Sequence, residues 1–175
     1  AVSRVEREVL FLKGPGAFLV LDRADTNGAA EAVWQLNTPI APASAGDGWE
    51  ITGTQSTLAV TPLFPASPAG QVLDWPSLDA DMDGGYRLDV TDPAAAGHAR
   101  FLFLLAETGT VEGAAPLPGA GTLGAAVTFT DGTIAEVVFG DDSAGGTLKL
   151  TSGGVVVFDG PLPSAVGTLP LFDVN

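Results

Sequence analysis

The sequence predicts an all-β protein, an antiparallel β-sandwich of two sheets joined by hairpins and by loops rich in proline and glycine. Apolar and polar residues alternate with a period of two in several segments, and the 23 glycines and 13 prolines recur at turn-like intervals. No segment shows the 3.6-residue apolar period with capping residues that a long helix requires. Of the 175 residues, 46% are hydrophobic, which favours a packed core, and we expect residues 1–175 to form one domain.

The elements are expected in a definite order along the chain. Residues 9–12 and 18–21 are apolar throughout, which is typical of central strands covered on both faces, and the Gly-Pro-Gly at 14–16 predicts a hairpin turn between them. Alternation predicts half-buried strands at 31–36, 86–91 and 147–151. Residues 101–105 and 125–130 predict further strands, and the turns Asp131-Gly132 and Gly153-Gly154 predict two more hairpins. Residues 61–85, 94–97 and 114–124 are expected to be loops.

The charge of the chain argues against several classes of partner. The formal net charge is -14, with only seven basic residues, so the average surface repels a phosphate backbone and we expect no nucleic-acid partner. The longest apolar run, residues 101–106, is far shorter than the ~20 residues of a membrane-spanning helix, and we expect no membrane partner. The absence of cysteine excludes disulfides and thiol catalysis. This composition fits a secreted or periplasmic protein.

An acidic motif raises the hypothesis of a calcium site. Asp79, Asp81 and Asp83 precede Gly84 and place oxygen ligands at alternate positions before a glycine turn. The closing glutamate of an EF-hand is absent, because Val90 occupies that position. A calcium site of another type and a solvated acidic turn are both open interpretations.

Enzymatic motifs are sparse in this chain. His98 is the only histidine, so a zinc site with two histidines cannot form, and local hydrogen bonding is its default role. There is no G-x-S-x-G elbow for a serine hydrolase. Glycines at 119, 121 and 124 match the letters of a dinucleotide loop, but a strand rather than a helix is expected to follow them.

Four aromatic residues could stack on a sugar ring. Trp34 and Trp49 alternate with polar neighbours on predicted strands, so burial is the default for both. Trp75 lies in a proline-rich segment and is the better exposed candidate, and Tyr86 begins a predicted strand.

Three segments carry a resemblance to a known family. The sequence R-E-V-L-F-L at 7–12 is followed by V-L-D-R at 20–23 and by W-Q-L-N at 34–37. This order resembles the C-terminal β-sandwich of heparinase II/III-like polysaccharide lyases, in which strands reading R-x-V-L-F-V, V-L-D-R and W-x-L-H follow one another. The likeness is clearest over residues 5–38 and continues more loosely through 86–90 and 98–107.

The resemblance implies an accessory domain cut from a longer chain. In that family a helical toroid precedes the sandwich, and tyrosine and histidine drive β-elimination beside a uronate carboxylate. Here Asn37 replaces the histidine, and an amide cannot act as a general base, so we expect the chain alone to be inactive. The substrate-binding residues that we predict are Arg23, Trp34, Asn37 and Trp75, although Arg23 with Asp22 also fits a structural pair.

Two further interpretations stay open. A carbohydrate-binding or structural β-module that needs no toroid, stabilised by calcium, is the main alternative, and a small complete enzyme lacks a visible acid–base pair. If the chain is a lyase domain, its polysaccharide partner would be anionic. An anionic polymer would be repelled by this surface unless the arginines gather on one face. If a sheet face once covered a toroid, we expect the isolated domain to form homodimers through it.

Overall fold

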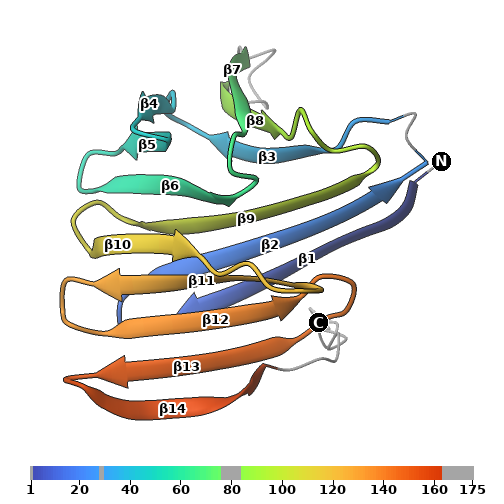
Figure 1. The fold of residues 1–175 in the computed structure, drawn as a ribbon. Helices are drawn as coiled ribbons and strands as arrows, with labels where there is room; N and C mark the ends of the chain where they lie inside the picture. The colour runs from blue at the N-terminus through green and yellow to red at the C-terminus, as the bar shows by residue number, and fades with distance from the viewer. Residues whose placement is uncertain (1, 28–29, 76–83, 163–175) are drawn as a thin grey trace, which may run out of the picture.

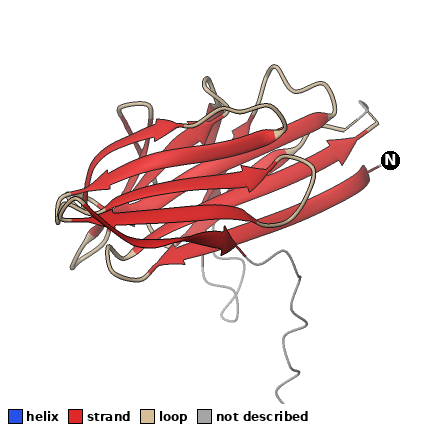
Figure 2. Ribbon diagram, turned by 60° about the horizontal axis from the view of Figure 1, so that its bottom comes forward, coloured by secondary structure: helices blue, strands red, loops and turns tan. Residues whose placement is uncertain are grey.

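A computed structural model gives the fold, and it describes residues 2–27, 30–75 and 84–162. The described residues form strands and no helix (Figure 2). None of them forms a helix of the length and hydropathy that crossing a membrane requires. The strands are β1 Val2–Leu12, β2 Ala17–Thr26, β3 Val33–Thr38, β4 Ala43–Ala45, β5 Gly48–Thr52, β6 Thr57–Phe64, β7 Ala69–Trp75, β8 Gly85–Thr91, β9 His98–Glu107, β10 Val111–Pro116, β11 Thr122–Phe129, β12 Ile134–Gly140, β13 Gly146–Ser152 and β14 Val155–Leu162.

The strands form three antiparallel sheets. A central sheet has the order β1-β2-β9-β6-β5-β4, a five-stranded sheet runs β10-β11-β12-β13-β14, and a three-stranded sheet runs β3-β8-β7. In Figure 1 the three-stranded sheet lies at the top and the five-stranded sheet at the bottom, with β6, β9, β2 and β1 of the central sheet between them and β4 and β5 at the upper left. The predicted all-β antiparallel fold is confirmed, with three sheets in place of the two that were expected.

The third sheet arises because the central strands are apolar on both faces. On β9, Leu102 and Leu104 belong to the core shared with the five-stranded sheet. Phe101 and Phe103, at the alternate positions, belong to the core shared with the three-stranded sheet. Each fully buried side chain of this size contributes about 1.5–3 kcal/mol to folding, so both faces of β9 need a cover.

The three predicted hairpins are confirmed. Leu12 pairs with Ala17, Thr128 with Ile134, and Ser152 with Val155 across the three turns. The last turn has only two residues, Gly153 and Gly154, with φ values of 57° and 79°. Positive φ at both positions is the geometry of a type I′ turn, which matches the twist of the flanking strands.

Two of the predicted loops are wrong in part. Residues 61–85 contain the end of β6, all of β7 and the first residue of β8, and residues 114–124 contain the end of β10 and the start of β11. Pro62 and Pro116 misled the prediction, because each lies where its strand has a paired neighbour on one side only. Pro62 lies beyond Val60, the last residue of β6 that pairs with β5, and Pro116 ends β10 at the edge of its sheet. The loop expected at 94–97 does separate β8 from β9.

A close contact between layers involves Gly70 of β7. The indole of Trp49, which is 8% exposed on β5, packs against this glycine. A Cβ atom on Gly70 would lie 2.0 Å from Cζ2 of Trp49, which is far inside van der Waals contact. The absence of a side chain at position 70 therefore lets the three-stranded sheet approach the central sheet.

We predict that Gly70→Ala destabilises the protein by about 1–3 kcal/mol, because the added methyl group overpacks the site of Trp49. The measurement is the urea unfolding midpoint with an unchanged m value. Gly113→Ala, in β10 where nothing lies within 4 Å of the new Cβ, is the matched control and should change the stability little. Equal stability of the two variants would contradict this packing of Trp49 against Gly70.

Candidate functional site

The outer face of the three-stranded sheet carries polar side chains from neighbouring strands. Leu88 and Val90 of β8 point into the core, so Arg87 and Asp89 lie on the opposite, outer face. The register places Asn37 of β3 beside Arg87 and Gln35 beside Asp89. These four residues therefore form a continuous polar patch on one sheet face.

A hollow of about 570 Å³ opens at the end of this patch. The ends of β3, β7 and β8 form its walls, and the indole of Trp75 stands beside them with 46% of its surface exposed. The prediction that Trp75 is exposed is confirmed. The side chains of Gln35, Asn37, Trp75 and Arg87 line the hollow.

Arg87 links the aromatic and polar parts of the site. Its Nε donates to Oδ1 of Asp89 at 2.8 Å and its Nη2 donates to Oδ2 at 3.0 Å, which is a bidentate pair. The Cζ atom of Arg87 lies 5.2 Å from the ring centroid of Trp75, within the range of a cation–π contact. Gln35 donates from Nε2 to Oδ1 of Asp89 at 3.1 Å. These contacts fix the orientations of four side chains.

Of the four predicted substrate-binding residues, Asn37 and Trp75 meet in this hollow. Trp34 does not, because it is 3% exposed and stacks on Phe103 with 4.0 Å between the ring centroids. Its expected burial, like that of Trp49, is confirmed, and a buried indole offers no face to a sugar. Trp34 is therefore no part of the surface site, and its Nε1 has no hydrogen-bond partner among the described residues.

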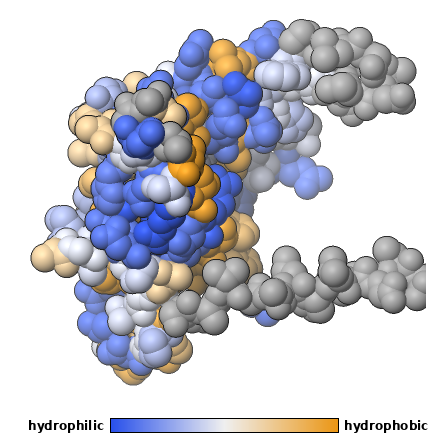
Figure 3. Space-filling model, turned by 90° about the vertical axis from the view of Figure 1, so that its right-hand side faces the viewer, coloured by the Kyte–Doolittle hydropathy of each residue, from blue (hydrophilic) through white to orange (hydrophobic). Residues whose placement is uncertain are grey.

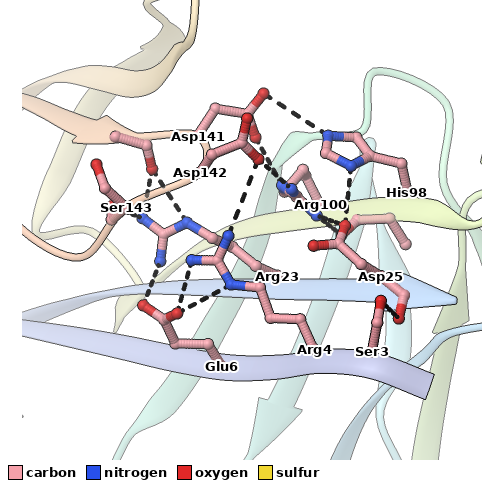
Figure 4. A network of polar contacts seen from close by, with 12 residues as sticks. Ser3, Arg4, Glu6, Arg23, Asp25, His98, Arg100, Asp141, Asp142 and Ser143 are labelled. Carbon is pink, nitrogen blue, oxygen red and sulfur yellow. Dashed lines mark hydrogen bonds and ion pairs between the residues drawn. The ribbon is translucent and has the colours of Figure 1, made fainter.

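The side chain of Arg23 is fully buried and does not reach a surface ligand. A second hollow of about 470 Å³, between β1, β2 and β3, is lined by both Arg23 and Asn37. The guanidinium, however, donates to the carbonyl oxygens of Gly140 and Ser143 and pairs with Glu6 and Glu8. Figure 4 shows the guanidinium of Arg23 between Glu6 and Ser143. Arg23 therefore acts as a structural link between the central sheet and the turn that joins β12 to β13.

A second buried arginine strengthens the same junction. Arg100, which is 2% exposed, donates to Asp25 at 2.8 Å, to Asp141 at 2.6 Å and to Asp142 at 3.0 Å (Figure 4). The hydrogen bond from Arg100 lowers the pKa of Asp25 below its ordinary value. Nδ1 of His98 lies 2.8 Å from Oδ1 of the same aspartate, which agrees with the local hydrogen-bonding role expected for this histidine. The end of the molecule seen in Figure 3 is accordingly largely hydrophilic, with a strip of hydrophobic side chains.

Metal ligation has little support among the described residues. The predicted calcium ligands Asp79, Asp81 and Asp83 lie outside the described residues. His98, Asp141 and Asp142 bring their ligand atoms within 4.8 Å of one another. Because Arg100 already binds both of these carboxylates, a cation would have to compete with a buried guanidinium.

Comparison of the chain with protein-family models and with curated proteins found no match. The resemblance to heparinase II/III-like lyases therefore rests on the three quoted sequence segments.

The sequence reasoning missed three members of the site, namely Gln35, Arg87 and Asp89. The signal was present, because residues two apart on a strand share a face, and this places Gln35 with Asn37 and Arg87 with Asp89. Their meeting depends on the pairing of β3 with β8, which spans more than fifty residues of sequence.

We predict that Arg23→Met destabilises the protein by about 3–5 kcal/mol, because Glu8 then stays partly buried without its cation. The double variant Arg23→Met with Glu8→Leu should regain part of that loss, because no charge is left unpaired. Thermal and urea unfolding of the wild type, both single variants and the double variant provide the double-mutant cycle. Additive effects of the two substitutions would contradict a direct ion pair.

Proposed function

We propose that this chain is a non-catalytic carbohydrate-binding β-domain and that the hollow beside Trp75 is its ligand site. The observation that carries the proposal is the convergence of a half-exposed indole with amide and guanidinium groups from neighbouring strands. The apolar faces of sugar rings pack on aromatic rings, and sugar hydroxyl groups pair with amides and guanidinium groups. A secreted or periplasmic location belongs to the same proposal.

The described part of the site favours binding over catalysis. Arg87 and Asp89 neutralise each other, and Asn37 is an amide that can donate and accept hydrogen bonds without transferring a proton. General acid–base hydrolysis of a glycosidic bond uses two carboxyl groups on either side of that bond. Among the described residues that line the hollow there is no carboxylate.

We predict that Trp75→Ala weakens binding of the cognate glycan at least tenfold, because loss of the ring removes about 1.4 kcal/mol or more of contact. A glycan array identifies the ligand, and isothermal titration calorimetry then measures the affinity. Phe158→Ala is the matched control, because Phe158 is 45% exposed, lies in the five-stranded sheet and is aromatic.

Two results would refute this function: a wild-type chain that binds no glycan on the array, or a Trp75→Ala variant that binds as tightly as the wild type. Thermal unfolding of both variants must first show that they are folded. An Asn37→Ala variant should show a smaller loss than Trp75→Ala, because it removes one polar contact rather than a stacking surface.

A second candidate function, the accessory domain of a polysaccharide lyase, is favoured by an apolar surface on β1 and β2. Val5, Val9, Phe11 and Phe18, which we call the β1–β2 stripe, are 42–78% exposed. Phe11 and Phe18 stack with 4.5 Å between their ring centroids. The pairing places these residues on the face of the central sheet that points away from the five-stranded sheet. Such a stripe fits contact with another domain.

The second candidate is tested in the complete gene product that contains these 175 residues. If this second candidate is right, that product cleaves a uronate polymer by elimination, detected by the ultraviolet absorbance of the unsaturated ends, whereas the isolated chain does not. Val9→Ser with Phe11→Ser should lower this activity by loosening the domain contact, and Val155→Ser with Val157→Ser, on exposed β14, is the control. A complete product without elimination activity would rule out this candidate.

A further inference from the structure

We propose that the hollow beside Trp75 selects neutral glycans over glycans that carry uronate or sulfate groups. This inference rests on the carbohydrate-binding function proposed above and names its class of ligand. Arg87 is the only charged residue among the described residues that line the hollow. An anionic sugar could therefore be attracted to the hollow only if the charge of Arg87 were available to it.

The charge of Arg87 is already balanced within its own strand. Asp89 lies two residues further along β8, on the same face, and receives two parallel hydrogen bonds from the guanidinium. Such a fork has the geometry with which arginine would hold a ligand carboxylate. A uronate ligand would have to displace Asp89 or approach with that carboxylate still in place. Both routes disfavour an anionic sugar.

The other arginines do not supply the missing positive charge. Each of them has a carboxylate partner in the central sheet or in the turn between β12 and β13: Arg4 pairs with Glu6, Arg7 with Asp22, Arg23 with Glu6 and Glu8, and Arg100 with Asp25, Asp141 and Asp142. The arginines thus do not form an uncompensated basic face, which an anionic polymer would need against a net charge of -14.

The groups that stay available suit hydroxyl groups. Asn37 is exposed and makes no side-chain hydrogen bond within the described part of the chain, so its amide can both donate and accept. Gln35 donates to Asp89 and keeps its side-chain oxygen as an acceptor. Arg87 keeps the N–H groups of Nη1, and it lies over only one face of the Trp75 ring. Neutral sugar hydroxyl groups, which both donate and accept, match this set.

The test compares matched neutral and anionic oligosaccharides. Tetramers of glucose, mannose and xylose are titrated into the full chain by calorimetry alongside tetramers of galacturonate and mannuronate. We expect the wild type to bind at least one neutral tetramer and to bind every uronate tetramer at least tenfold more weakly.

The Asp89→Asn variant should change this selectivity. The substitution keeps the shape of the side chain and leaves the charge of Arg87 uncompensated, so uronate affinity should rise about fivefold and fall again with added salt. The neutral tetramer is titrated in parallel, and the ratio of uronate affinity to neutral affinity is the quantity that is compared with the wild type. Asp22→Asn is the matched control, because Asp22 accepts a similar bidentate pair from Arg7, at 2.6 Å and 2.5 Å, in the central sheet.

The outcomes separate this inference from the function on which it rests. A wild-type chain that prefers a uronate tetramer would overturn the neutral class while leaving carbohydrate binding intact. An equal rise of uronate affinity in both variants would show an effect of total charge and would also overturn the inference. A wild-type chain that binds none of the tetramers and nothing on the glycan array would overturn the proposed function and the inference together.

Discussion

Burial of both faces of β9, a strand inside the central sheet, is the constraint on which the rest of the structure depends. β9 alternates Phe101 and Phe103 on one face with Leu102 and Leu104 on the other, and all four are almost completely buried. Such a strand cannot expose either face to water, so one further sheet must pack on each of its two faces. The three-stranded sheet, whose outer face carries the candidate site, is present because one of those faces needs a cover.

The two buried arginines solve a related problem at one end of the molecule. Arg23 and Arg100 extend from neighbouring central strands toward the turn between β12 and β13, where each finds several oxygen acceptors. Buried guanidinium groups are tolerated only when they are paired and hydrogen-bonded, so these contacts fix how the five-stranded sheet lies on the central sheet. The same pairing removes these cations from any surface that could attract an anionic ligand.

Charge compensation also decides the chemistry of the candidate site. Arg87, Asp89 and Gln35 form a hydrogen-bonded group that holds the guanidinium beside Trp75. The result is a surface with directional hydrogen-bonding groups and an aromatic ring but little net charge. This surface agrees better with a sugar-binding domain than with the uronate chemistry implied by the lyase resemblance, while the β1–β2 stripe is the feature that still favours a domain contact.

The sequence by itself determined the fold class, the hairpins and the burial of Trp34 and Trp49, because alternation and glycine turns are local signals. It also singled out Asn37 and Trp75. Only the tertiary structure decided that these two meet beside Arg87 and that Arg23 is buried, because strand order and register join residues far apart in the chain. The third sheet was not predicted for the same reason. Apolar residues on both faces of β9 indicate that a layer packs on each face, but local patterns do not reveal which strands form those layers.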